Sequence, residues 1–259
     1  MNMRWLRLAR WIALSSLLVF LCPQISQAGI LTGLVAYYPF DGNANDASGH
    51  GYDLALAGNA GFASGQFGQA LSLDGTGNQY ASRPISDAAF NFGSGDFTIQ
   101  GWADFATVGA PEILIEKFTG GSGPGWTLYA LSGGIEFYNG GPVTASQALA
   151  TNQWYQFAVE QSGGTLSLFV NGSLLASGTV GTTISTDPLL IGRRNAGDGR
   201  ACGLNGQIDD VAIWNRALSQ DEISYLSLHP LSSANSVPEP GTVFLLGLGI
   251  LLLCRKRLA

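Results

Sequence analysis

The chain has 259 residues, and residues 29–233 hold six Lys and Arg against seventeen Asp and Glu, a net charge of −11. This charge excludes nucleic acid and anionic lipid surfaces as partners of that region, and it favours Ca²⁺, which prefers carboxylate and carbonyl ligands. Cys202 is the only cysteine in the region, so an intrachain disulfide is excluded there. We expect a packed thiol, with intermolecular pairing as the alternative.

Residues 1–28 have the three parts of a secretory signal peptide, which implies export through the Sec machinery. Three arginines make the positive start, and residues 11–22 make the apolar segment. Small residues at Ser26 and Ala28 predict cleavage after Ala28. A retained membrane anchor is the alternative, but the apolar segment is shorter than the roughly 20 residues that a span needs.

The middle of the chain is rich in Gly, Ser, Thr and Asn and poor in charge. Short segments of alternating apolar residues recur there with turn residues between them, a spacing that predicts an all-β sandwich or barrel. Gly163-Gly164 and Asn171-Gly172 each predict a tight hairpin turn. The expected strands are Leu34–Phe40, Leu54–Ala57, Ala70–Leu73, Phe97–Phe105, Ile113–Phe118, Trp126–Leu131, Ile135–Tyr138, Trp154–Gln161, Thr165–Val170, Leu189–Arg193 and Gln207–Trp214.

One short helix is expected at the end of this region. Ser219 and Glu222 have the spacing of a capping box, and Leu218 and Ile223 are placed to pack against each other around it. The helix is expected to close the domain near residue 228. We therefore divide the chain into a signal peptide (1–28), a domain (29–231), a linker (232–236) and a C-terminal segment (237–259).

The C-terminal segment joins a Pro-Glu-Pro motif, an apolar run and a basic end. The apolar run covers thirteen residues, Thr242–Cys254. As a helix it spans about 20 Å of a membrane core of about 30 Å, so we expect transient membrane association with the basic end in the cytoplasm. The motif and basic-end residues are Val237, Pro238, Glu239, Pro240, Arg255, Lys256 and Arg257.

This segment resembles the PEP-CTERM sorting signal. The resemblance implies recognition and cleavage by an exosortase in a Gram-negative bacterium that makes exopolysaccharide. The implied destination is the cell surface, a biofilm matrix or the medium. A short tail anchor that stays in the membrane is the alternative.

Several stretches of the chain resemble laminin G-like, concanavalin A-like domains, namely residues 34–49, 97–102, 154–160, 166–172 and 205–219. The first contains Tyr-Pro-Phe-Asp-Gly-Asn, and the last contains Gly-Gln-Ile-Asp-Asp-Val-Ala-Ile-Trp. The resemblance covers about residues 32–228. It implies a jelly-roll sandwich of two antiparallel sheets, with the first and last strands close together.

One carboxylate on the closing strand is expected to need a partner. The two-residue period places Asp210 with Ile208, Ala212 and Trp214, and an unpaired carboxylate in an apolar layer is costly. The resemblance implies Ca²⁺, held by the loop after the first strand and by the Asp-Asp pair. The expected ligands are Asp41, Asn43, Asp46 and Asp210. Hydrogen bonds from loop amides to Asp41 and Asp210 are the alternative, and Asp46 also suits a turn closed by its own side chain.

Catalysis is not expected. Glu112 and Glu116 have a superficial likeness to a catalytic Glu-x-Asp-x-Glu strand, but Leu114 stands at the central position. In a regular strand their backbones are about 13 Å apart, whereas a retaining glycosidase needs carboxyl groups about 5–5.5 Å apart. A glycoside-active enzyme therefore remains only a distant alternative.

Two functions remain, a module that binds carbohydrate or glycoprotein and a structural matrix protein without a discrete ligand. We favour binding. Forked guanidinium groups suit carboxylates, including those of acidic polysaccharides, and an exposed aromatic ring beside a Gly-rich loop suits sugar stacking. The candidate ligand-binding residues are Arg193, Arg194, Asp198, Arg200 and Trp126.

Overall fold

The computed structural model describes residues 27–121, 123–179, 181, 184–195 and 202–232. The chain divides into two units, and the fold below is that of the unit Ile30–Val237. The signal segment up to residue 26 and the sorting residues from Val237 to Arg257 lie outside the described residues. Ala28 lies in a four-residue helical turn, α2 (Gln27–Ile30). No helix in the described ranges is both long and apolar enough to cross a membrane.

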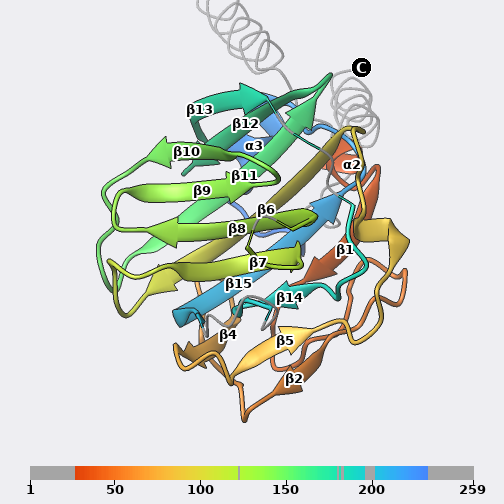
Figure 1. The fold of residues 1–259 in the computed structure, drawn as a ribbon. Helices are drawn as coiled ribbons and strands as arrows, with labels where there is room; N and C mark the ends of the chain where they lie inside the picture. The colour runs from red at the N-terminus through yellow and green to blue at the C-terminus, as the bar shows by residue number, and fades with distance from the viewer. Residues whose placement is uncertain (1–26, 122, 180, 182–183, 196–201, 233–259) are drawn as a thin grey trace, which may run out of the picture. The chain divides into compact units, whose positions relative to one another are not determined.

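Two antiparallel sheets face each other, with the seven-stranded sheet in front in Figure 1. This confirms the predicted sandwich of two antiparallel sheets. The eight-stranded sheet has the order β13-β12-β11-β6-β15-β4-β3, with β1 also paired to β15. Its strands are β1 (Leu34–Tyr38), β3 (Gly61–Ser64), β4 (Gln69–Asp74), β6 (Phe97–Phe105), β11 (Trp154–Ser162), β12 (Thr165–Val170), β13 (Ser173–Thr179) and β15 (Asn205–Trp214).

The seven-stranded sheet has the order β10-β9-β8-β7-β14-β5-β2. Its strands are β2 (Ala55–Ala57), β5 (Tyr80–Ser82), β7 (Glu112–Phe118), β8 (Gly125–Leu131), β9 (Gly134–Tyr138), β10 (Pro142–Ser146) and β14 (Leu190–Ile191). A short 3-10 helix, η1 (Ala88–Phe90), precedes β6. The sequence patterns missed β3, β5, β10 and β13, because these strands are short or exposed and carry little apolar alternation.

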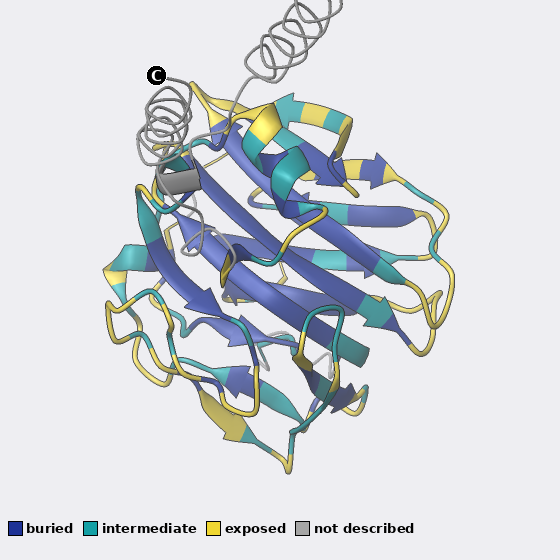
Figure 2. Cartoon of the chain, turned by 180° about the vertical axis from the view of Figure 1, so that it is seen from behind, coloured by how far each residue is buried: buried dark blue, intermediate teal, exposed yellow. Residues whose placement is uncertain are grey.

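One apolar core fills the space between the sheets. Phe97 of the eight-stranded sheet and Trp126 of the seven-stranded sheet both lie beside Phe137, with ring centroids 5.9 and 6.2 Å away. Burying a large apolar side chain stabilises the fold by roughly 1.5–3 kcal/mol, so this interface is the main source of stability. Seen from behind, the long strands are buried and exposure is concentrated in the loops (Figure 2).

Two predicted hairpins are confirmed. Ser162 pairs with Thr165 across Gly163-Gly164, and Val170 pairs with Ser173 across Asn171-Gly172. All four turn residues have positive φ, which the two-residue turns that match strand twist require.

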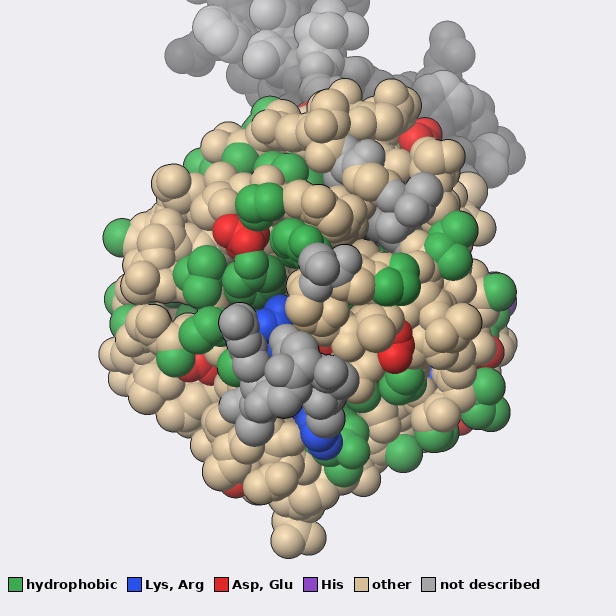
Figure 3. Space-filling view, viewed as in Figure 1, with side chains coloured by type: hydrophobic (Ala, Val, Ile, Leu, Met, Phe, Trp, Pro, Cys, Tyr) green, Lys and Arg blue, Asp and Glu red, His purple; other side chains and the backbone are tan. Residues whose placement is uncertain are grey.

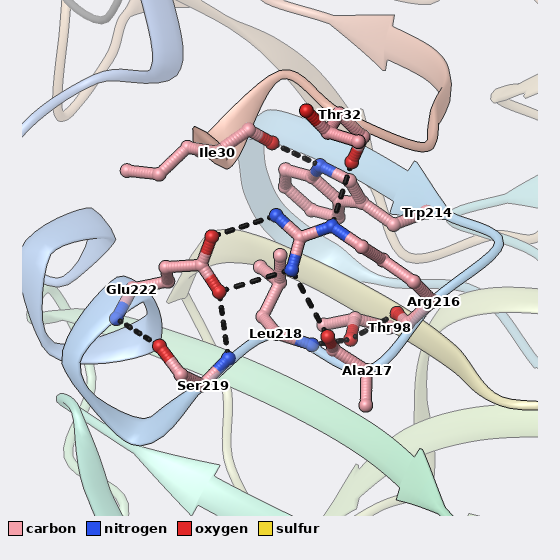
Figure 4. Close-up of polar contacts among 9 residues, drawn as sticks. All are labelled: Ile30, Thr32, Thr98, Trp214, Arg216, Ala217, Leu218, Ser219 and Glu222. Carbon is pink, nitrogen blue, oxygen red and sulfur yellow. Dashed lines mark hydrogen bonds and ion pairs between the residues drawn. The ribbon is translucent and has the colours of Figure 1, made fainter. Parts of the chain in front are cut away.

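The last residue of β15 and the chain after it hydrogen-bond to the start of the domain, as Figure 4 shows. Trp214 donates its indole N–H to the Ile30 carbonyl at 2.7 Å. Arg216 binds the Glu222 carboxylate through both guanidinium ends, at 2.7 and 3.0 Å, and donates from Nε to the Thr32 carbonyl at 2.7 Å. Because β1 pairs with β15, the first and last strands are neighbours, as the family resemblance implied.

The predicted helix is confirmed as α3 (Gln220–Leu226). Its capping box is complete, since Ser219 N–H donates to Glu222 Oε2 at 2.7 Å and Glu222 N–H donates to Ser219 Oγ at 3.2 Å. Leu218 and Ile223 on either side of the cap are buried. Glu222 therefore joins the helix cap to Arg216.

We expect Glu222→Ala to lower the free energy of unfolding by about 2–3 kcal/mol, because it removes half of the cap and leaves Arg216 without its carboxylate. Urea denaturation of the domain measures this. Asp221→Ala is the matched control, since Asp221 is an exposed carboxylate on the same turn, and we expect it to cost less than about 1 kcal/mol. Equal losses in the two variants would contradict the assigned role of Glu222.

Candidate functional site

Strand β15 changes partner in the middle of its length. Its first half pairs with β4 through Ile208, and its second half pairs with β1 from Val211 onward. Along its other edge β15 pairs with β6, and that register shifts between Asp209 and Ala212. Asp210 has φ 48°, the left-handed region that few residues other than glycine adopt. Asp209 and Asp210 thus sit in a bulge where β1 and β4 meet end to end.

The bulge overturns one prediction about this strand. Asp210 was expected on the same face as Ile208, Ala212 and Trp214, but the extra residue changes the phase of the alternation. Ile208, Val211 and Ile213 face the core instead. Asp210 is nevertheless buried, at 2% exposure, where the Tyr37 hydroxyl donates to its Oδ1.

Two further carboxylates lie close to Asp210. Asp209 is fully buried and its Oδ2 accepts the Phe67 N–H at 3.0 Å, while Asp41 Oδ1 accepts the Gln69 N–H at 2.8 Å. The loop before β4 fits tightly between them. Gly68 has φ 59° and a Cβ there would lie 2.1 Å from Asp41 Oδ1, so a larger residue would strain the backbone and displace the carboxylate.

The cluster is electrostatically strained. Burial raises the pKa of Asp209 to about 7, with repulsion from Asp210 and Asp41 adding to the effect of burial and the Phe67 amide opposing it. Burial likewise raises the pKa of Asp210 to about 6, against the hydrogen bond from Tyr37. Asp209 Oδ1 and Asp210 Oδ2 are buried without a hydrogen-bond partner. Both observations suit a cation-binding role, because carboxylates are the preferred Ca²⁺ ligands.

The other two predicted ligands lie in a separate network of the loop after β1. Asn43 is exposed and its Oδ1 accepts the Asn45 N–H at 2.9 Å. The Asp46 carboxylate accepts the N–H groups of Tyr37, Ser48 and Tyr52 at 2.9–3.0 Å, so it closes the turn by itself. Within the described ranges, no three His, Cys, Asp or Glu groups converge tightly enough to form a metal site by themselves. Backbone oxygens would have to complete a site around Asp41, Asp209 and Asp210.

Glu112 and Glu116 on β7 are both engaged by main-chain amides. Glu112 accepts the Asn205 N–H at 2.7 Å, and Glu116 accepts the Asn195 N–H. Both side chains are buried, and a bulge interrupts the regular spacing of the strand between them. Their observed contacts are those of carboxylates that anchor loops.

A second feature is a pocket on the outer face of β7, β8 and β9. The alternation that sends Trp126, Leu128 and Phe137 into the core places Tyr129 and Tyr138 on the opposite face. The pocket has a volume of about 550 Å³, within the usual range for small-ligand sites. Figure 3 views this face, where hydrophobic side chains gather around a hollow. The lining residues are Pro111, Phe118, Gly121, Tyr129, Leu131, Tyr138 and Arg194.

Of the predicted ligand-binding residues that the structure describes, only one lines the pocket. Arg194 lines the pocket, and Arg193 lies over the Tyr80 ring at 4.6 Å. Asp198 and Arg200 lie outside the described residues. The prediction for Trp126 is wrong, because its ring is fully buried and its N–H donates to the Phe90 carbonyl at 3.0 Å. The pocket tyrosines were missed, although their alternation with apolar residues was visible in the sequence.

Comparisons with solved structures agree with the fold. Domain 4 of AbnA, an extracellular GH43 arabinanase from Geobacillus stearothermophilus, in complex with arabinotriose, is 18% identical with TM-score 0.60 and covers 75% of this chain and 98% of that domain. The binding domain of Paraclostridial Mosquitocidal Protein 1 is 17% identical with TM-score 0.63 over 76% of this chain. The binding domain of botulinum neurotoxin DC in complex with SialylT is 15% identical with TM-score 0.60 over 79% of this chain.

This chain spans about half the length of the two toxin domains, 52% in each case. At these identities the likeness shows the fold alone. No curated protein sequence matches the chain.

Two family profiles match the sequence. Residues 74–224, more than half of the chain, match the laminin G family described as the concanavalin A-like lectin/glucanases superfamily. Residues 236–257 match the PEP-CTERM protein-sorting motif, which implies export, sorting to the cell surface and processing by an exosortase. The chain therefore belongs to the concanavalin A-like lectin/glucanases superfamily, as a laminin G-like domain joined to a PEP-CTERM sorting motif.

Proposed function

We propose that this exported protein binds carbohydrate without catalysis, through the pocket on the outer face of β7, β8 and β9. The observation that carries the proposal is the aromatic lining. Phe118, Tyr129 and Tyr138 gather in one hollow, where Tyr138 meets Phe118 edge to face with ring centroids 5.6 Å apart. Aromatic rings with a polar edge bury the apolar face of a ligand while they hydrogen-bond to its periphery. Arg194 supplies a charged group in the lining, and Glu136, which accepts a hydrogen bond from Tyr129, supplies another next to the pocket.

The comparisons support a sugar ligand more than any other kind. The arabinanase domain is described in complex with arabinotriose, and one toxin domain with SialylT. Fold likeness is weak support for function, so the proposal depends on the pocket. The ligand we expect is an extracellular polysaccharide or the glycan of a glycoprotein. A structural matrix protein without a discrete ligand is the competing function.

A glycan array probed with the domain of residues 29–236 tests the proposal, followed by titration of the best ligand. We expect Tyr138→Ala to weaken binding at least about tenfold, equal to about 1.4 kcal/mol, because it removes a ring from the pocket. Tyr225→Ala is the matched control, since Tyr225 lies on α3, outside the pocket lining, and stacks on His229. No glycan bound by the wild type, together with retention in purified matrix, would favour the structural role instead.

We also propose that Ca²⁺ stabilises the domain by binding at Asp209 and Asp210, with backbone oxygens as further ligands and Asp41 nearby. Two buried oxygens without partners and two carboxyl groups with raised pKa support this, because a divalent cation would neutralise their repulsion. Asn43 and Asp46 are not part of the proposal, since their own loop satisfies them. The cation has no assigned role in sugar binding.

Without Ca²⁺, we expect stability to rise as the pH is lowered from 8 to 5. The folded state keeps protons on Asp209 and Asp210 up to pH about 7 and 6, while the unfolded chain releases them near pH 4. The stabilisation is therefore full below pH 4 and lost as the pH rises through 6 and 7. Between pH 8 and pH 5 we expect the free energy of unfolding to rise by on the order of 2–4 kcal/mol. Urea denaturation in the presence of a chelator measures this. Asp209→Asn should flatten the profile, and an unchanged slope would contradict the assignment.

At pH 7.5 we expect millimolar Ca²⁺ to raise the Tm by several degrees, because a ligand bound only to the folded state stabilises it. Differential scanning fluorimetry after chelation measures the shift, with Mg²⁺ as the ion control. Asp209→Asn should abolish the shift, and Asp221→Asn, which removes one exposed charge from α3, should keep it. If the wild type shows neither a shift in Tm nor heat on calorimetric titration with Ca²⁺, the cation proposal is wrong.

A further inference from the structure

Three polar side chains form a row across the outer face beside the pocket. Tyr129 of β8 and Thr144 of β10 both lie directly opposite Glu136 of β9. Tyr129 lines the pocket, Glu136 beside it is partly buried and Thr144 is exposed. A ligand that extends from the pocket past Tyr129 would therefore meet the row. We call Tyr129, Glu136 and Thr144 the acceptor row.

Both hydroxyl groups of the row donate their hydrogen bond to Glu136. Tyr129 Oη donates to Glu136 Oε1, and Thr144 Oγ1 donates to Oε2 at 2.7 Å. Burial, and then the hydrogen bond to Glu136 and its charge, raise the pKa of Tyr129, so the phenol keeps its proton. A hydroxyl has one proton and two lone pairs, and a carboxylate has only lone pairs. The row therefore presents hydrogen-bond acceptors and no free donor.

An acceptor-only row selects its ligand by chemistry. A sugar hydroxyl donates to it, whereas a sugar carboxylate brings lone pairs and a negative charge against Glu136, and like charges in contact are strongly unfavourable. We infer that the pocket prefers neutral glycans and rejects uronate-bearing ones, with Glu136 as the specificity-determining residue. This inference rests on the proposed sugar-binding function.

Arg194 offers the opposite chemistry in the same pocket. A guanidinium group pairs readily with carboxylates, so if Arg194 governed recognition, acidic glycans would bind more tightly. The net charge of −11 over residues 29–233 adds to the bias against polyanions. The experiment therefore measures whether Glu136 or Arg194 determines the preference between neutral and acidic glycans.

The experiment uses matched pairs of ligands. Polygalacturonate, alginate and other acidic polysaccharides are arrayed before and after chemical reduction of their carboxyl groups, so that each pair shares one backbone. We expect the wild-type domain to bind reduced forms at least about tenfold more tightly than acidic forms. Glu136→Gln places a donor amide in the row. It should weaken binding of the reduced forms and bring the ratio of affinities for the reduced and acidic forms close to one. Asp221→Asn removes a charge from α3 and should keep the wild-type ratio.

The outcomes separate the inference from the function on which it rests. Equal or tighter binding of acidic forms, lost in Arg194→Gln, overturns the role of Glu136 and leaves sugar binding intact. A wild-type preference for neutral forms that survives in Glu136→Gln also overturns it. If the wild type binds no member of the array while its Tm shows that it is folded, the proposed function itself fails and the inference fails with it.

Discussion

The exchange of partners along β15 is the constraint on which the acidic cluster depends. Along one edge β15 pairs with β6. Along its other edge the first half of β15 pairs with β4 and the second half pairs with β1. The bulge at Asp209 and Asp210 fills the junction, and the loops that end β1 and begin β4 meet the two carboxylates there. At the far end of the same β1–β15 pairing, Trp214 and Arg216 hydrogen-bond to Ile30 and Thr32, so the acidic cluster and the closure of the domain lie at opposite ends of one strand pair.

Much of the fold could be predicted because its central strands alternate clearly. Tyr155, Phe157 and Val159 illustrate this, since all three enter the core from β11. The missed strands lack this signal. β13 at the sheet edge is mostly exposed, and β5 has three residues, so their formation depends on neighbours that are distant in sequence. The phase error at Asp210 has another cause, because a bulge adds a residue that no periodic pattern reveals.

The site could be predicted less well than the fold. The resemblance pointed to Asp41 and the Asp-Asp pair, and the structure does place these carboxylates together, because the strand exchange brings distant loops to one junction. It did not distinguish Asp46, whose local turn satisfies it. The Gly-rich loop before Trp126 suggests an exposed ring, whereas the position of Trp126 in its strand does not. The alternation with Leu128 assigns Trp126 to the core and Tyr129 to the surface.

Two electrostatic effects act on a polyanionic ligand, and they differ in range. The net charge of −11 acts at a distance, and salt screens it with a Debye length of about 8 Å at physiological ionic strength. The acceptor row acts only in contact, where lone pairs of Glu136 meet the ligand directly and salt screens the charges much less. High salt therefore weakens the first effect and leaves the second. A preference for neutral glycans that persists in high salt would belong to the row, whereas one that disappears would belong to the charge of the whole domain.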